Sequence, residues 1–222
     1  MIAGAVPREV PTPLGPARVH VVAPAGAVQG TLVLGHGAGG GVASADLAAV
    51  AAAAAAAGWR VVLVDQPWRV AGKRIAPAPP RLDEGWTAVL AALRAEIAGP
   101  LVLGGRSAGA RVACRTAAAQ GAAGVLALAF PLHPPGRPEK SRLAELTGAG
   151  VPTLVLQGER DSFGRPEEFP DVEGVDMAVV PGADHGFRVP ARGPVSQGDA
   201  LGILVEATLE WVVHVAGESL RT

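Results

Sequence analysis

The chain has 222 residues, and 49% of them are hydrophobic, which is enough for a sizeable core in one α/β domain or two small ones. Its 19 basic and 20 acidic residues give a net charge of −1, and no block of like charge stands out. We therefore expect neither a nucleic acid nor an anionic membrane as a partner. The one cysteine, Cys114, excludes an internal disulfide and a cysteine-based metal cluster.

The sequence indicates neither a targeting segment nor a membrane-spanning one. Residues 1–16 carry Pro, Glu and Arg early and lack the basic stretch and apolar core of a signal peptide. The longest apolar run, an alanine tract near 48–57, is too short to span a bilayer. The sequence therefore predicts a cytoplasmic protein.

Seven apolar runs predict strands, and helical segments separate most of them. Several runs are continuous in Val and Leu, which is typical of a parallel sheet buried on both faces. The predicted strands are 18–22, 31–34, 60–64, 101–103, 125–129, 153–156 and 175–180. The predicted helices are 47–57, 82–98, 108–120, 139–146 and 198–216. This alternation predicts a doubly wound, mostly parallel sheet of about seven strands, and without a dividing linker we expect one domain over residues 1–222.

The most informative motif is Gly105-Arg106-Ser107-Ala108-Gly109, which follows an apolar run and precedes an alanine-rich helical segment. A strand that enters a helix through Gly-x-Ser-x-Gly is the signature of a nucleophile elbow. The turn is tight and strained, so its flanking positions must be small. This context favours Ser107 as a nucleophile over an idle serine in a glycine-rich turn.

A serine nucleophile needs a histidine base and an acid that orients the histidine. His185 lies in the loop after the last predicted strand, at the same carboxyl edge of the sheet as Ser107. The acid should fall between them in chain order. Asp161, a few residues after the penultimate strand, is the preferred acid, and Glu159 is its competitor. Asp184 is less suitable, because adjacent side chains in a loop rarely face one another.

Two backbone N–H groups should form an oxyanion hole beside the nucleophile. One is expected from Ala108, which follows the nucleophile. The other is expected from the glycine-rich turn 35–41, with Ala38 or Gly39 as the donor. We expect His36 to brace this turn rather than to act in catalysis.

The glycine-rich turn also supports a rival hypothesis. Gly35, Gly37 and Gly40 fit G-x-G-x-x-G, and the next strand ends at Asp65, which is the outline of a dinucleotide-binding unit. Asp65 follows Gly40 by 25 positions, which is longer than the usual spacing. The hypothesis leaves the elbow and the predicted acid and base unexplained, so it stays the weaker alternative.

Several stretches together resemble the α/β-hydrolase superfamily. They are GHGAGG, VVLVDQPWR, GGRSAGARVA, FPLHPPGRPEK, LVLQGERDSFG and GADHGFRVP, and they span residues 35–190. The chain looks most like the small dienelactone-hydrolase-like branch, which includes relatives of the hydrolase-like domain in a subunit of a chromatin acetyltransferase complex. The resemblance implies an α/β-hydrolase sheet with Ser107 as nucleophile, Asp161 as acid and His185 as base.

The loops at the expected catalytic edge bear on specificity. The connection 130–152 is too short to hold a helical cap domain, so we expect an open cleft. Trp68, His133 and Phe163 fall in loops at this edge and are candidates to bind substrate, with ordinary packing as the alternative. Arg106 is expected in a structural ion pair.

The predicted function is a serine hydrolase that cleaves a carboxylic ester, a thioester or a related small acyl compound through an acyl-enzyme. Its partner would be a small-molecule acyl substrate, and the reaction would need no metal and no cofactor. Position 107 holds a serine, whereas haloalkane and epoxide chemistry in this fold normally uses a carboxylate. The alternative from a different class is a noncatalytic interaction module with the same fold.

Overall fold

One eight-stranded sheet forms the centre of the computed structural model, which describes residues 4–219. The strand order is β1-β2-β4-β3-β5-β6-β7-β8. β2 is antiparallel to both of its neighbours, and all other adjacent strands are parallel. The strands are β1 (Ala5–Val10), β2 (Ala17–Val22), β3 (Gly30–Gly35), β4 (Trp59–Asp65), β5 (Leu101–Arg106), β6 (Gly124–Leu128), β7 (Thr153–Gly158) and β8 (Val175–Val180).

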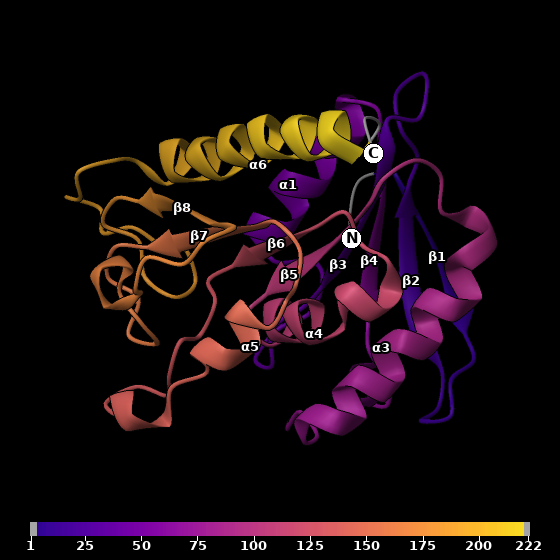
Figure 1. Cartoon of the computed structure of the whole chain (residues 1–222), viewed down its shortest axis with the longest axis horizontal. Coiled ribbons are helices and arrows are strands. Elements are labelled where there is room, and N and C mark those ends of the chain that lie inside the picture. The colour runs from indigo at the N-terminus through magenta and orange to yellow at the C-terminus, as the bar shows by residue number, and fades with distance from the viewer. Residues whose placement is uncertain (1–3, 220–222) are drawn as a thin grey trace.

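Helices cover both faces of the sheet and give the molecule three layers (Figure 1). On one face, α1 (Ala45–Ala56) packs beside α6 (Gln197–Ser219). The helices whose buried side chains join the core of the other face are α2 (Pro67–Val70), α3 (Pro79–Leu93), α4 (Ala108–Thr116) and α5 (Leu143–Thr147). Single turns of 3₁₀ helix occur at Arg94–Glu96, Ala118–Gln120, Pro138–Lys140 and Pro166–Glu168.

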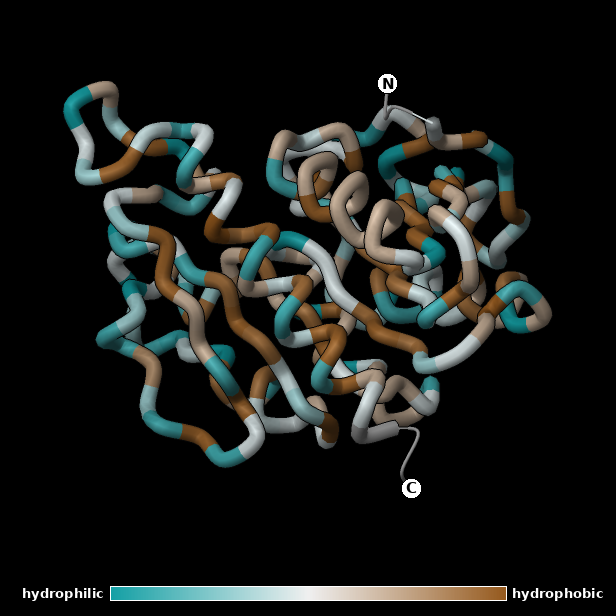
Figure 2. Tube along the Cα trace, turned by 90° about the horizontal axis from the view of Figure 1, so that it is seen from above, coloured by the Kyte–Doolittle hydropathy of each residue, from teal (hydrophilic) through white to brown (hydrophobic). Residues whose placement is uncertain are grey.

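The central strands contribute side chains to two hydrophobic cores, one on each face of the sheet. In β6, Val125 and Ala127 join the core under α3 and α4, whereas Leu126 and Leu128 join the core under α1 and α6. Because successive side chains point to opposite faces, a strand buried on both faces must be apolar throughout. This explains the continuous Val and Leu runs, which appear as brown segments inside the trace in Figure 2.

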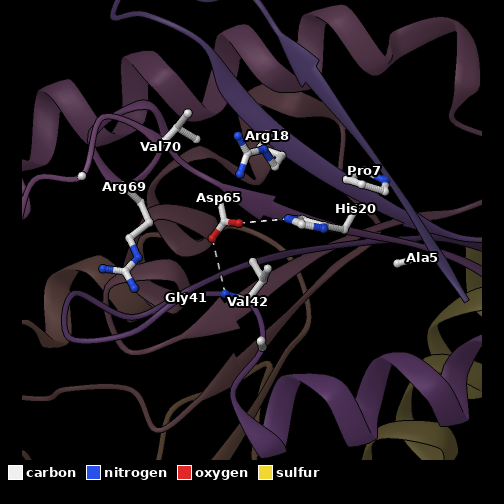
Figure 3. Close-up of a pocket in the computed structure, with 11 residues that line it drawn as sticks. Ala5, Pro7, Arg18, His20, Gly41, Val42, Asp65, Arg69 and Val70 are labelled. Carbon is white, nitrogen blue, oxygen red and sulfur yellow. Dashed lines mark hydrogen bonds and ion pairs between the residues drawn. The ribbon is translucent and has the colours of Figure 1, made fainter. Parts of the chain in front are cut away.

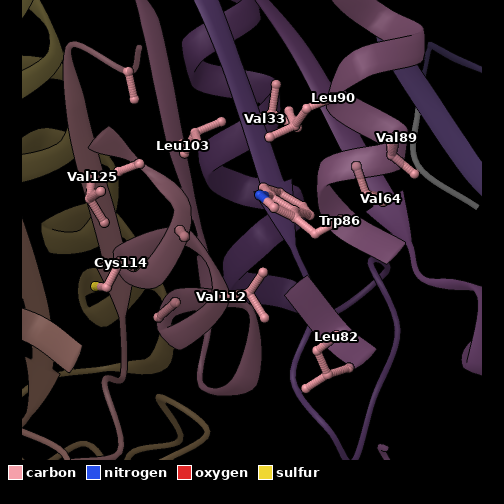
Figure 4. Close-up of a cluster of buried hydrophobic side chains, with 14 of the residues drawn as sticks. Val33, Val64, Leu82, Trp86, Val89, Leu90, Leu103, Val112, Cys114 and Val125 are labelled. Carbon is pink, nitrogen blue, oxygen red and sulfur yellow. The ribbon is translucent and has the colours of Figure 1, made fainter. Parts of the chain in front are cut away.

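The core under α3 and α4 is built around a tryptophan. Trp86 of α3 is fully buried and faces Val33 of β3 and Val64 of β4 (Figure 4). Cys114 of α4 belongs to the same cluster, and burial raises the pKa of its thiol to about 12. This cysteine is therefore an apolar packing residue rather than a reactive thiol.

All seven predicted strands are present, and the eighth, β1, was missed. Only Val10 of β1 is buried, so the strand has no apolar run, and Pro7 interrupts its pattern. A proline is tolerated there because β1 is an edge strand. The helix predicted over 139–146 is wrong in its bounds: a 3₁₀ turn precedes a five-residue α5.

α6 is the one helix, among the residues that the structure describes, whose length and apolar composition would suit a membrane span. One third of that segment is buried, and it packs on α1, β7 and β8. Its buried residues include Leu204, Trp211 and Val215, which recur at helical spacing. We therefore interpret α6 as a packed outer helix of the fold.

Candidate active site

Ser107 lies on a sharp turn between β5 and α4, as the elbow motif predicts. Its backbone has φ +53° and ψ −107°, a conformation that non-glycine residues rarely adopt. Its N–H donates to the carbonyl of Leu128 at the end of β6, at 2.9 Å. The turn is thus held by the neighbouring strand, and the hydroxyl faces the cleft at the carboxyl edge of the sheet.

The two glycines of the motif are required by a close approach to β3. A Cβ on Gly109 would lie 2.5 Å from the carbonyl oxygen of Gly35, and a Cβ on Gly105 would clash with the same atom. Backbone atoms of a central strand cannot move aside for a methyl group. The small residues of the elbow therefore let α4 pack directly onto the sheet and bring Ser107 to its edge.

Ser107, His185 and Asp161 form one hydrogen-bonded chain. The Nε2 atom of His185 lies 3.0 Å from the Ser107 hydroxyl oxygen. The Nδ1 atom of His185 lies 2.8 Å from a carboxylate oxygen of Asp161, which is fully buried. Since an ionised carboxylate only accepts, Nδ1–H donates to Asp161, and Nε2 is left as the acceptor for the serine proton.

Buried donors compensate the charge of Asp161. Its Oδ1 accepts the N–H of Phe163 at 2.8 Å, and its Oδ2 accepts Nε2–H of Gln157 at 2.9 Å. The same Gln157 nitrogen faces the carbonyls of Gly164 at 2.7 Å and Phe130 at 3.3 Å. Three acceptors around one nitrogen fix the orientation of this buried amide, so Gln157 holds Asp161 in place.

Glu159 and Asp184, the two carboxylates that compete with Asp161 in the sequence, do not contact the histidine ring. Glu159 accepts the N–H of Gly182 at 2.6 Å, at the start of the loop that carries His185. Asp184 accepts the N–H groups of Gly186 and Arg188, which closes a turn around His185. Both side chains therefore shape the loop backbone, and Asp161 alone of the three is aimed at the imidazole.

Phe163 packs against the His185 ring. The two ring centroids are 4.2 Å apart and the planes are inclined by 29°, which is a stacked arrangement. Phe163 also lines the cleft around Ser107. This side chain therefore limits the rotation of the imidazole and borders the space for a ligand.

The cleft has a volume of about 780 Å³. Its wall includes residues 37–39, 44–46, 106–107, 184–186 and 188, together with Gln197 and Leu201 of α6. Ala38 and Gly39 of the predicted oxyanion turn lie in this wall beside Ser107. Ala108 is the first residue of α4, where backbone N–H groups have no acceptor within the helix.

His36 braces the glycine-rich turn as a neutral ring. Its Nδ1 donates to the Gly37 carbonyl at 2.8 Å, and its Nε2 accepts the N–H of Gln66 at 3.2 Å. Burial lowers the pKa of His36, and the nearby Asp65 carboxylate opposes that shift only in part. His36 therefore ties the turn to the end of β4 and does not reach the cleft.

Arg106 joins three parts of the site. One of its guanidinium N–H groups donates to the His185 carbonyl at 3.0 Å, and its Nε lies 3.4 Å from a carboxylate oxygen of Asp46 at the start of α1. Arg106 thus forms the expected ion pair and also lines the cleft. Ser44, in the same wall, has a buried hydroxyl without a hydrogen-bond partner among the described residues.

Two of the three candidate substrate-binding residues lie outside this cleft. The Trp68 ring packs on the His36 ring with centroids 5.4 Å apart, and its side chain belongs to a hydrophobic core. His133 accepts or donates at both nitrogens, contacting the Pro134 carbonyl at 3.0 Å and Glu168 at 2.8 Å. These partners raise the pKa of His133, the Pro134 carbonyl first. Trp68 packs in the core and His133 forms an ion pair with Glu168, so Phe163 alone of the three lines the cleft.

Sequence reasoning missed the supporting residues Gln157 and Asp46. A polar Gln157 at the end of an apolar strand was the available signal for the first, whereas nothing in the sequence marks Asp46. No cluster of three or more His, Cys, Asp or Glu side chains that could hold a metal ion occurs among residues 4–219 described by the structure.

Comparison with known families decides the family of this chain. Residues 28–213 match the model of a family described as alpha/beta hydrolase domain. The chain belongs to the α/β-hydrolase family. The predicted superfamily and fold are therefore confirmed. A comparison with curated protein sequences found no match.

Solved structures of α/β hydrolases share this architecture. A serine hydrolase without a lid from Xanthomonas campestris is 23% identical, with a TM-score of 0.72, and 95% of this chain and 96% of that chain are covered. Dienelactone hydrolase from Anabaena variabilis is 19% identical, with a TM-score of 0.69 and coverages of 95% and 98%. Est1E from Butyrivibrio proteoclasticus is 12% identical, with a TM-score of 0.71 and coverages of 95% and 100%.

The Xanthomonas campestris hydrolase is described as lacking a lid, and this chain also lacks a cap domain between β6 and β7. In this α/β hydrolase, the described connection between β6 and β7 contains only a 3₁₀ turn and α5. The predicted capless fold is confirmed, and the cleft beside Ser107 opens directly at the carboxyl edge of the sheet.

Proposed function

We propose that this α/β hydrolase is a serine hydrolase that cleaves small carboxylic esters, thioesters or related acyl compounds. The observation that carries the proposal is the continuous chain from the Ser107 hydroxyl through His185 to the buried carboxylate of Asp161, with distances of 3.0 and 2.8 Å. A nucleophile, a base and an orienting acid in hydrogen-bond reach of one another are the requirement for acyl transfer.

In the first half-reaction, Ser107 Oγ attacks the acyl carbonyl carbon while Nε2 of His185 takes the hydroxyl proton. The N–H of Ala108 and an N–H of the Ala38–Gly39 segment stabilise the oxyanion of the tetrahedral intermediate. The intermediate then expels the alcohol or thiol, which receives the proton from His185. The product of this step is an ester of Ser107 with the acyl group.

In the second half-reaction, water attacks the acyl-enzyme and His185 accepts its proton. Collapse of the new tetrahedral intermediate returns that proton to Ser107 Oγ and releases the carboxylic acid. Asp161 keeps Nδ1 protonated throughout and stabilises the imidazolium ion. The hydrogen bonds from Gln157 and from the Phe163 N–H keep the Asp161 carboxylate aimed at the ring.

The test is labelling with a fluorophosphonate, followed by mapping of the modified residue and assays with p-nitrophenyl acetate. We expect the label on Ser107. Ser107→Ala should fold normally and lose about 10⁴-fold or more of the turnover. Ser44→Ala is a matched control, because it removes the other cleft hydroxyl and should leave both the label and its position unchanged.

Two outcomes would contradict the proposal. Full esterase activity in folded Ser107→Ala protein, or a label mapped to another residue, would remove Ser107 as the nucleophile. Folded wild-type protein that turns over no ester and takes no label would favour the noncatalytic module. The described contacts favour the hydrolase over the dinucleotide alternative, because residues 37–39 border the Ser107 cleft and the Asp65 carboxylate is bound to His20.

A further inference from the structure

A second concavity lies on the α1 face of the sheet, over its antiparallel strands (Figure 3). The cross-strand pairs Arg18–Asp65 and Pro7–His20 put these four side chains on one face. α1 packs mainly on α6 and β4 and touches β2 only slightly, so it leaves most of this face of β1 and β2 uncovered. Residues 41–43 and the end of α2 close the pocket, whose volume is about 450 Å³. It shares no lining residue with the Ser107 cleft.

The one acidic side chain that lines this pocket is already bonded to the protein. Asp65 Oδ2 lies 2.9 Å from Nε2 of His20, and Asp65 Oδ1 accepts the N–H of Val42 at 3.4 Å. Figure 3 shows Asp65 between these two partners. Because Nε2 of His20 faces Asp65, only the Nδ1 side of that ring is left for a ligand.

Two guanidinium groups in the same lining are not neutralised in this way. Among residues 4–219 of the structure, the Arg69 guanidinium has no hydrogen bond and no ion pair. It lies beside Gly41, where a Cβ would be 3.6 Å from its Nε. Among the residues that the structure describes, Arg18 forms an ion pair only with Glu9, at 3.3 Å. The two side chains are 45% and 59% exposed, so water screens that pair.

We propose that this pocket binds a small organic anion. Its acidic group would pair with the guanidinium groups of Arg69 and Arg18, and its short apolar part would pack on Val42 and Val70. Guanidinium groups bind carboxylates and phosphates through paired, charge-assisted hydrogen bonds. This fits Arg69, which has no ion pair among the described residues, and Arg18, whose pair with Glu9 is screened by water, in a cavity with apolar walls. The inference is independent of the function proposed for Ser107.

The probes are butyrate and n-butyl phosphate, with 1-butanol as the neutral analogue, added to the full chain at constant ionic strength. Binding is followed by the backbone amide shifts of Gly41 and Val42 in NMR titrations and by calorimetry. We expect saturable binding of at least one of the two anions and none of butanol. The anion that binds more tightly identifies the acidic group as carboxylate or phosphate.

Three variants locate the site. Arg69→Gln should weaken anion binding about 10-fold or more, since it removes the unpaired charge. Gly41→Ala should also weaken anion binding, because the new methyl would occupy space beside the guanidinium group. It would lie 3.4 Å from Asp65 and 3.6 Å from Arg69, without a clash. Arg192→Gln is the matched control: it removes an exposed charge outside the lining of both cavities and should leave affinity within about 2-fold.

The proposal is overturned if neither anion gives saturable shifts at Gly41 and Val42 at millimolar concentration. It is also overturned if Arg69→Gln and Arg192→Gln bind alike, or if butanol binds as well as the anions. The titration is repeated with Ser107→Ala protein, which should bind the anion with the affinity of the wild type. This result would show that anion binding does not depend on the proposed catalytic serine.

Discussion

Ser107 is one of three non-glycine residues of the described chain with positive φ, and the other two lie close in sequence to residues that hold the candidate active site. The others are Ala129, with φ +47°, and Phe187, with φ +54°. Ala129 follows the Leu128 carbonyl that holds Ser107, and Phe187 comes two residues after His185. Each such residue costs about 1–3 kcal/mol, and native hydrogen bonds at 2.8–2.9 Å hold all three. Backbone strain is thus concentrated around the triad.

The assignment of Asp161 rather than Glu159 as the acid can be tested by replacing each carboxylate with its amide. Asp161→Asn should lower kcat for p-nitrophenyl acetate about 10⁴-fold, because the amide favours the wrong imidazole tautomer. Glu159→Gln should change kcat little, since an amide oxygen still accepts the Gly182 N–H. Both variants should keep the wild-type circular dichroism spectrum. The opposite ranking of the two kcat values would assign the acid to Glu159.

His36 should make stability depend on pH. Burial lowers its pKa in the folded state, so as pH falls through about 6.5 the unfolded chain takes up a proton first and the free energy of unfolding decreases. The loss continues down to the folded pKa, with a slope of at most about 1.4 kcal/mol per pH unit. Asp65 opposes this shift, and Arg69 adds to it.

Urea unfolding between pH 7.5 and pH 5 would measure this dependence against a His36→Gln variant. The raised pKa of His133 acts in the opposite direction, because it adds stability at low pH that is lost as pH rises through its folded pKa. The difference between the wild type and the variant isolates His36. Equal pH slopes in the two proteins would show that His36 titrates alike in the folded and unfolded states.

At the scale of elements, α4 is fixed by ion pairs as well as by packing. Arg111 of α4 reaches Glu145 of α5, and Arg115 reaches both Glu145 and Asp83 of α3. Burial opposes ionisation of Glu145, but the two arginines outweigh it and lower its pKa. The helix that follows the elbow is therefore joined by ion pairs to both α3 and α5.

Arg106 links β5, α1 and the His185 loop, and we expect it to act as a positioning residue. Arg106→Gln should lower kcat/KM for p-nitrophenyl acetate by about 10- to 100-fold, because the loop carrying the base loses its anchor and small misplacements are costly. Arg106→Lys should recover part of the loss, since one ammonium donor still reaches the carbonyl.

The readout that separates positioning from stability is the rate of fluorophosphonate labelling at a temperature where each variant is folded. It should fall in parallel with kcat/KM in Arg106→Gln and recover in Arg106→Lys. Identical labelling rates in the wild type and Arg106→Gln would make the Arg106 contacts purely structural.

At the scale of the whole molecule, the short connection between β6 and β7 leaves the cleft without a roof. Long acyl chains would have no enclosed apolar surface to bury, so they would gain little binding energy over short ones. We expect kcat/KM on p-nitrophenyl esters to be highest for acetate or butyrate and to fall for long chains. A clear preference for long-chain esters would show that another surface encloses the acyl chain.

The sequence by itself predicted the central strands, the elbow and the chain order Ser107, Asp161, His185 of the hydrogen-bonded side chains. These features depend on local signals. Continuous apolar runs indicate strands that are buried on both faces. The Gly-x-Ser-x-Gly turn needs its glycines because the elbow approaches Gly35 closely. Asp161 and His185 could be selected because loops after successive parallel strands open at one edge of a sheet.

Only the tertiary structure decided which polar groups meet across the fold. The Arg106–Asp46 pair and the contact of Gln157 with the Phe130 carbonyl join segments that no local pattern relates, and the exposed edge strand β1 lacks an apolar run. Trp68 lies in the short helix α2 rather than in the predicted loop, whereas His133 lies in a loop as predicted. Packing of Trp68 and the ion pair of His133 hold both side chains away from the cleft. Side-chain direction depends on neighbours brought close by the strand order, and that order is set by packing of the whole chain rather than by any one segment.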